Sequence, residues 1–277
     1  MSAIINLSDL VGQLTTSGIA DSQFMYKSGL RQGAAPTAPV IGRWTSLWMY
    51  DGAPGGASSA PTTTPDIPTN TTAGSQMQND PGGGRQKWLL GASMAGLTTG
   101  TVMIYDRLME QGGLGSTTIT PQTVSGVITR YTNGIGNQIW AEIYTQIGAN
   151  STTISCIYKN QSGNTSTSQL ATFGNTGFRE QDRWIQIPLA SGDTGVQQVT
   201  SVTVTATTGT AGSFGITVAH PLTYVYLPLA GVGSVRDLIS GAPGIVEVVP
   251  GACIAYSWLA NTTTIPQLFG LLNMVEK

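Results

Sequence analysis

The chain has 277 residues, of which 36 are glycine and only 9% are charged, and its net charge is −2. A charge this balanced excludes a protein whose affinity comes from neutralising many phosphates, so we expect no nucleic-acid partner. With 40% hydrophobic residues the chain also lacks the composition of a disordered protein, and we expect it to fold.

The first 27 residues lack the basic start and continuous apolar stretch of a secretory signal, so export by that route is not expected. Within them, residues 6–11 predict a short helical turn, because the Ser8 hydroxyl can accept hydrogen bonds from the amides that open a helix. Residues 43–50 then form an aromatic cluster. Two interpretations of Trp44 and Trp48 stay open: they pack on the chain's own β domain, or they anchor an arm on a neighbouring subunit.

Residues 52–84 form a Pro/Gly/Thr-rich segment in which Ile67 and Met77 are the large apolar side chains. Five prolines favour extended backbone and forbid a regular helix, so this segment cannot build a core of its own. We therefore expect residues 1–84 to be an extended, mostly irregular N-terminal arm with a linker.

From residue 86 onward apolar and polar residues alternate with the period of a β-strand. The residues Gly148-Ala149-Asn150 join two such runs and are typical of a hairpin loop. Expected strands are residues 101–107, 124–131, 138–147, 152–159, 165–173, 184–189, 201–207, 215–220, 223–229, 245–249 and 254–259. Many short strands without amphipathic helices between them predict an all-β fold, an antiparallel β-sandwich that is jelly-roll-like over residues 85–277.

The apolar stretch at residues 214–235 contains Pro221, Pro228 and His220 in a β-like pattern, so we expect no membrane-spanning helix and no membrane partner. Cys156 and Cys253 lie in β-like runs without metal-ligand spacing; two buried thiols are expected, and one disulfide stays open. The sequence predicts no metal site and no cofactor.

Residues that could carry catalysis are few. His220 is the single histidine and would have to act without a second imidazole, so we expect it to be structural. Glu180 and Asp182 are the closest acidic pair, but Arg179 and Arg183 alternate with them, and pairing of opposite charges is expected. The glycine-rich stretches complete no phosphate-binding motif. We therefore predict a protein that is not an enzyme.

Scarcity of charge is itself informative. Between residues 186 and 235 the only charged side chain is Asp193. Exposed monomers carry interspersed charges for solubility, whereas surfaces buried in assemblies are depleted of Lys, Glu and Asp. The sequence thus predicts a homo-oligomer whose subunits cover much of one another.

This charge-poor layout, with the stretches at residues 43–48, 83–90, 105–108 and 138–144, resembles virion structural proteins of tailed bacteriophages, in particular head decoration (cement) proteins. The resemblance implies a trimer on the capsid exterior that is assembled in the host cytoplasm, binds the major capsid protein and bridges neighbouring capsomers. Candidate capsid or subunit contacts are Arg43, Trp44, Leu47, Trp48, Tyr50, Arg85, Lys87 and Trp88.

The alternative is a tail or fibre adhesin that binds a host-surface glycan through the sandwich loops. Trp140, Tyr144 and Trp258 are aromatic side chains that could stack on sugar rings. At strand positions, however, such side chains are more often core or subunit contacts.

Overall fold

The computed structural model describes residues 7–15, 20–76, 78–237 and 246–277. Every pairing between its described strands is antiparallel. The elements in chain order are α1 (Leu7–Thr15), β1 (Ala20–Arg31), β2 (Trp44–Ser46), β3 (Tyr50–Ala53), β4 (Lys87–Gly96), β5 (Gly100–Gly115), β6 (Gln122–Thr123), β7 (Gln138–Ile143), β8 (Thr152–Asn160), β9 (Thr165–Thr167), β10 (Ala171–Phe173), β11 (Arg183–Ile187), β12 (Val196–Val204), β13 (Ser213–Leu227), β14 (Ser234–Asp237), β15 (Val246–Val248), β16 (Ile254–Ala260) and β17 (Leu268–Glu276).

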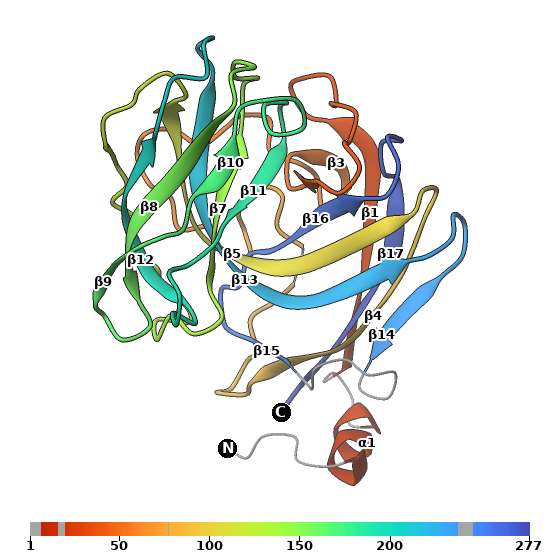
Figure 1. Ribbon diagram of the computed structural model, residues 1–277. Coiled ribbons are helices and arrows are strands. Elements are labelled where there is room, and N and C mark those ends of the chain that lie inside the picture. Colours follow the sequence, from red (N-terminus) through yellow and green to blue (C-terminus); the bar gives the residue numbers. More distant parts are fainter. Residues whose placement is uncertain (1–6, 16–19, 77, 238–245) are drawn as a thin grey trace.

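These strands form a closed barrel and two further sheets. The barrel has the order β11-β2-β16-β5-β13-β7. Sheet A has the order β14-β4-β17-β1-β3 with β15 beside β4, and sheet C has the order β10-β8-β12-β6 with β9 beside β8. In Figure 1 sheet C lies to the left of the barrel and sheet A to the right. The all-β antiparallel prediction is confirmed, but the strand order differs from the two four-stranded sheets of a jelly roll.

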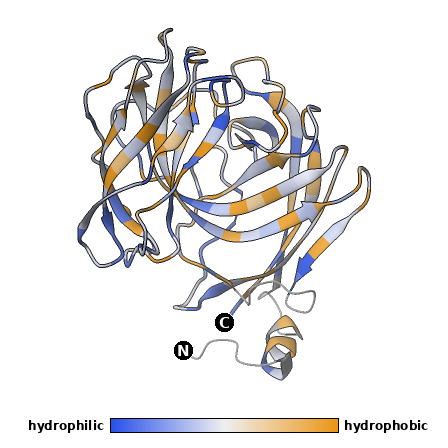
Figure 2. Ribbon diagram, viewed as in Figure 1, coloured by the Kyte–Doolittle hydropathy of each residue, from blue (hydrophilic) through white to orange (hydrophobic). Residues whose placement is uncertain are grey.

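Apolar side chains fill the two spaces beside the barrel and its interior. One cluster joins Ile143 of β7 to Cys156 of sheet C, and a second joins Met25 of sheet A to Tyr256 of β16. Inside the barrel Trp140 stacks on Trp184 with ring centroids 3.9 Å apart. Because β5 and β13 run along both sheets, nearly all of β5 is buried. Figure 2 shows that the strands of the barrel carry both hydrophobic and hydrophilic residues.

Most of the expected strands are present, but several boundaries differ from the prediction: residues 165–173 form two strands, β9 and β10, and β4 and β17 were not expected. Residues 215–220 and 223–229 belong largely to one strand, β13, in which Pro221 stands at a shift of register where a missing N–H is tolerated. Residues 124–131 contain no strand, although Val124, Ile128 and Arg130 are buried in alternation. Side chains in that segment alternate between buried and exposed positions, although no described strand pairs with it.

The N-terminal part differs from the expected arm. β1 pairs with β17 and β3, and β2 is a strand of the barrel between β11 and β16. Residues 20–53 are therefore part of the same folded unit as the strands after residue 85. The sequence does not indicate β1 as a core strand, because its inward positions include the cations Lys27 and Arg31 as well as apolar residues.

The expected helical turn is present as α1, although Ser8 lies inside the helix rather than at its cap. Leu10 of α1 packs beside Val275 of β17 and Trp88 of β4. Within the described ranges, no helix has the length and apolar character needed to cross a membrane.

Candidate functional site

Buried cations hold the long segment between β3 and β4 against the rest of the fold. Lys27 Nζ donates to the carbonyl of Pro54 at 2.8 Å, and Arg130 Nη2 donates to that of Pro68 at 2.8 Å. Arg107 Nη2 donates to the carbonyl of Ala73 at 3.3 Å, and Lys87 Nζ donates to that of Asn79. Each hydrogen bond fixes a backbone oxygen, so this segment is a structured cover over the fold.

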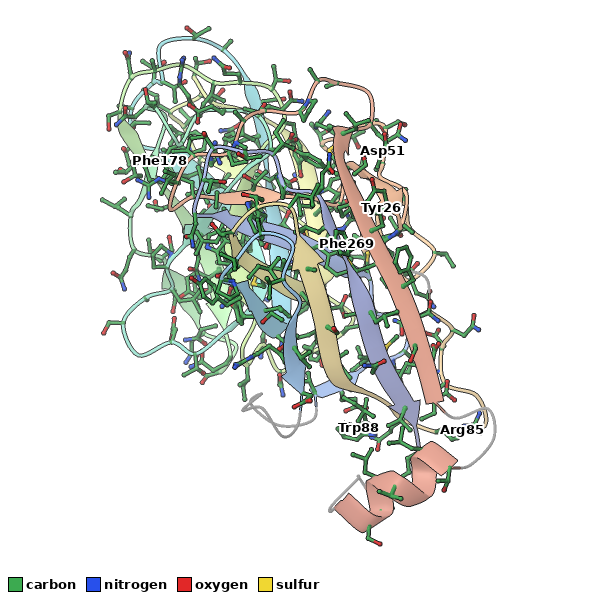
Figure 3. All side chains as sticks on the ribbon, turned by 90° about the vertical axis from the view of Figure 1, so that its right-hand side faces the viewer. Tyr26, Asp51, Arg85, Trp88, Phe178 and Phe269 are labelled. Atoms are coloured by element: carbon green, nitrogen blue, oxygen red, sulfur yellow. The ribbon has the colours of Figure 1, made fainter. Side chains whose placement is uncertain are left out.

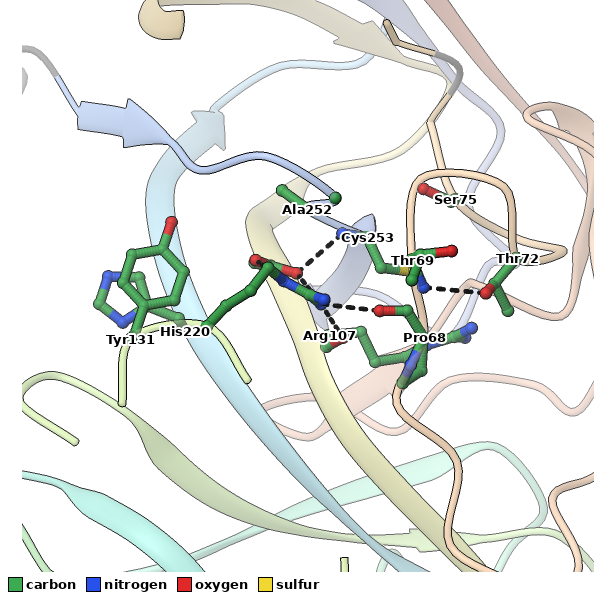
Figure 4. A network of polar contacts seen from close by, with 12 residues as sticks. Pro68, Thr69, Thr72, Ser75, Arg107, Tyr131, His220, Ala252 and Cys253 are labelled. Carbon is green, nitrogen blue, oxygen red and sulfur yellow. Dashed lines mark hydrogen bonds and ion pairs between the residues drawn. The ribbon is translucent and has the colours of Figure 1, made fainter. Parts of the chain in front are cut away.

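The centre of these contacts is the ion pair of Arg130 and Asp106, shown in Figure 4. Asp106 also accepts from the backbone N–H of Cys253 at 2.8 Å, and Arg130 also donates to the carbonyl of Arg107 at 2.9 Å. Both side chains are buried. A buried pair whose remaining polar atoms are also hydrogen-bonded positions the surrounding backbone, and here it joins β5, the residue before β16 and the covering segment.

The imidazole of His220 lies beside this pair and is structural, as expected. Its ring stacks on Tyr131 with centroids 3.8 Å apart, and Nδ1 lies 2.8 Å from Oδ1 of Asn137. Burial lowers the pKa of His220 to about 4. The stack on Tyr131 and the contact of Nδ1 with Asn137 hold the ring in place between segments far apart in the sequence.

A second buried carboxyl, Glu142, lies inside the barrel. Trp48 Nε1 donates to Glu142 Oε1 at 2.8 Å, and the hydroxyl of Tyr144 lies 3.5 Å from Oε2. Burial raises the pKa of Glu142 to about 7. A pKa in this range suits a general acid, but Glu142 is only 1% exposed, so no substrate reaches it in this conformation.

The acidic pair singled out in the sequence is also engaged. Glu180 lies 3.9 Å from Arg179 Nε and 3.7 Å from Arg183 Nη2, which confirms the expected pairing of neighbours. Asp182 instead accepts from Arg31 Nε at 2.6 Å, a partner in β1 that local spacing does not indicate. The two carboxylates are thus structural.

Both thiols are free and buried, which removes the disulfide interpretation. No group of three or more histidine, cysteine or acidic side chains among the described residues is placed to hold a metal ion.

The eight candidate contact residues fall into two groups. Leu47, Trp48, Tyr50 and Lys87 are buried within the chain, so they are core residues and do not form an interface. The open question about Trp48 is thereby settled in favour of the chain's own core. Arg43, Trp44 and Trp88 are partly exposed and Arg85 is exposed, so these four remain available to a ligand or partner.

An apolar surface that the sequence reading missed lies on sheet A. β1 turns Lys27 inward, whereas its exposed positions carry Phe24 at 57% and Leu30 at 59% exposure. Across the sheet Phe24 pairs with Leu271, and Tyr26 pairs with Phe269, as Figure 3 shows for the second pair. We call this surface the outer face of sheet A; its members are Phe24, Tyr26, Leu30, Val235, Phe269 and Leu271.

The three aromatic side chains considered for sugar stacking are not on the surface. Trp140, Tyr144 and Trp258 are all buried in the core. A glycan bound by this protein would need other residues.

No protein-family model, no curated protein and no solved structure matches the chain.

Proposed function

We propose that the protein is a non-enzymatic structural protein of a virion, a decoration protein that forms a homo-oligomer, taken as a trimer, on the capsid exterior and binds the major capsid protein. The observation that carries this proposal is the outer face of sheet A. There β1 places cations inside the molecule and large apolar side chains outside, the reverse of what an isolated soluble sheet favours.

The size of this face supports a contact between macromolecules. Its six side chains expose apolar area on the order of 500 Å², taking about 150–250 Å² for a whole aromatic side chain. A standard interface buries about 800 Å² per partner, of which somewhat more than half is apolar. The outer face of sheet A therefore supplies about the apolar area that one side of such an interface needs.

The distribution of charge supports the same proposal. Six of the cations, Lys27, Arg31, Lys87, Arg107, Arg130 and Arg183, are buried in the fold. The twelve basic residues of the chain thus leave a surface with even fewer charges than the composition indicates. Such a surface is suited to close contact with neighbouring subunits, where unpaired charges are costly.

The mechanism would be mass action. A protein that binds only the assembled lattice stabilises it by its free energy of binding. Several copies joined in one oligomer bind with higher avidity than a single copy. No cofactor and no reaction are required.

The test uses purified particles of the virus that encodes the protein and shells stripped of it. We expect hundreds of copies per particle on a quantified gel and saturable co-sedimentation with the stripped shells. The outer face of sheet A is taken as the contact between copies, so the double variant Phe24→Ser/Leu271→Ser should be monomeric and, without the avidity of the oligomer, should lose co-sedimentation. Leu170→Ser, at an exposed leucine beside sheet C, should retain it. A few tens of copies or fewer, or unchanged binding by the double variant, would refute the proposal.

The tail or fibre adhesin is the second candidate. The rings expected to stack on sugars, Trp140, Tyr144 and Trp258, are buried and therefore do not support this candidate. A pocket lined by Arg43, Phe178 and Arg183, where the barrel meets sheet C, offers an alternative glycan site. Low copy number together with tail localisation would favour this candidate over the decoration protein.

A further inference from the structure

A pocket lies where the barrel meets sheet C. Its volume is about 220 Å³, and it is formed by the start of β2, by β10, by β11 and by the loop between β10 and β11. The lining residues are Gly42, Arg43, Trp44, Ala171, Thr172, Phe178, Arg183, Trp184, Ile185, Gln186 and Pro188. Phe178 lies far from Tyr26 and Phe269 in Figure 3, so the pocket is separate from the outer face of sheet A.

The pocket has an exposed rim and a buried floor. Thr172 and Gln186 are exposed, whereas Ala171, Arg183 and Ile185 are buried. Sites for drug-sized ligands measure about 300–1,000 Å³. A pocket of about 220 Å³ is smaller and admits a group the size of one sugar ring.

Two cations line this pocket, and their charges are incompletely paired. Arg183 has a side-chain exposure of 1%; its Nη1 donates to Thr45 Oγ1 at 3.1 Å, and its Nη2 lies 3.7 Å from Glu180. The Nε atoms of Arg183 and Arg43 are buried without a hydrogen-bond partner among the described residues. Burial also lowers the pKa of Arg183, with Arg43 acting in the same direction.

The two carboxylates near these cations, Glu180 and Asp182, are already engaged, and Asp182 accepts from Arg31 Nε at 2.6 Å. Glu180 accepts from the backbone N–H of Gly177 at 3.0 Å and lies between Arg179 and Arg183. The buried guanidinium of Arg183 therefore lacks a closely hydrogen-bonded anion, and leaving a buried charge in that state is unfavourable. A ligand carboxylate would supply the missing partner through charge-assisted hydrogen bonds.

The rest of the lining fits a sugar ring. Phe178 is partly exposed and is held in place by the guanidinium of Arg43, which lies 4.0 Å from its ring centroid. Aromatic faces accept the C–H face of a sugar, while the side chains of Thr172 and Gln186 at the rim can exchange hydrogen bonds with hydroxyls. Uronic acids combine these groups: an apolar ring face, hydroxyls and one carboxylate.

We propose that this pocket binds a uronic acid, with Arg183 and Arg43 holding the carboxylate and Phe178 contacting the ring. The acid can be a free monosaccharide or the end residue of an acidic glycan. This site does not depend on the proposed capsid role, because it lies on a different face and its ligand is a small molecule.

The test is titration of the full-length protein with D-galacturonate, followed by isothermal titration calorimetry and by intrinsic tryptophan fluorescence. We expect saturable binding of galacturonate and none of D-galactose at the same concentrations. Digalacturonate separates the two sources: tighter binding than galacturonate indicates a glycan end, and equal binding indicates the free acid. If galacturonate does not bind, if galactose binds equally well, or if sulfate competes at equal concentration, the proposal is wrong.

Variants assign the site. Arg43→Gln should weaken galacturonate binding by about 10- to 100-fold, the range expected for lost hydrogen bonds to a charged group. Arg43→Lys retains the charge but loses the planar fork, and we expect an intermediate loss. Arg85→Gln, at an exposed arginine near α1 (Figure 3), is the matched control and should bind as the wild type. Equal binding by Arg43→Gln, with its fold confirmed by circular dichroism, would overturn the assignment.

Discussion

Arg130 donates two parallel hydrogen bonds to Asp106, from Nε to Oδ2 at 2.9 Å and from Nη2 to Oδ1 at 2.8 Å. The same Nη2 reaches the carbonyl of Pro68. One guanidinium thus connects a barrel strand to the segment that covers it.

Replacing this cation should destabilise the whole fold. Arg130→Met leaves the Asp106 carboxylate buried without its cation, and removing one partner of a buried pair costs about 3–5 kcal/mol. Urea denaturation followed by circular dichroism measures this change. Arg85→Met breaks an ion pair with Glu276 at 3.1 Å, but Arg85 has 42% side-chain exposure, so its loss should stay below about 1 kcal/mol. Equal effects of the two substitutions would contradict the structural role of Arg130.

Glu142 should make stability depend on pH in a particular direction. Its pKa rises from 4.5 to about 7 in the folded protein, so the folded state binds the proton more tightly than the unfolded state. The contribution of Glu142 to the free energy of unfolding is therefore fully present below pH 4.5 and is lost as the pH rises towards 7. Glu142→Gln keeps an acceptor for Trp48 and carries no charge, so it should gain stability relative to the wild type over this range.

The comparison must be between variant and wild type, because His220 acts in the opposite direction. Its pKa falls from 6.5 to about 4, so its contribution increases stability as the pH rises over that range. The difference in unfolding free energy between Glu142→Gln and wild type should grow by about 3 kcal/mol from pH 4.5 to pH 8, at about 1.4 kcal/mol per pKa unit. A difference that stays constant with pH would refute the assignment.

The outer face of sheet A should control self-association. Tyr26→Glu places a carboxylate next to Phe269, its cross-strand neighbour, where burial in an interface would leave the new charge unpaired. Sedimentation velocity should show an oligomer for the wild type and a monomer for the variant. Leu170→Glu adds the same charge beside sheet C and should retain the oligomer. A wild type that stays monomeric at high concentration would exclude this role for the face.

Strands with ordinary patterning could be predicted from sequence. β7, β8 and β16 alternate or concentrate apolar residues, and their positions agree with the expected segments. β1 could not be found in this way, because Lys27 and Arg31 occupy inward positions and their compensating partners come from distant segments. Lys27 donates to the carbonyls of Tyr50 and Pro54, and Arg31 pairs with Asp182.

The sequence indicated some residues of the candidate site but not those whose role depends on contacts between distant segments. Arg43 and Trp44 stood out as an aromatic and cationic pair, and both line the pocket on the barrel. Arg183 was interpreted only as a neighbour of Glu180. Its burial and its unpartnered Nε depend on the packing of β2 against β11, which local sequence does not encode.

The cations that hold the segment between β3 and β4 bind main-chain oxygens, which every amino acid possesses. Substitutions in that segment can therefore accumulate without breaking a single one of these attachments, provided the backbone keeps its route. Chains related to this one should differ widely in the composition of this cover while preserving the four basic residues beneath it.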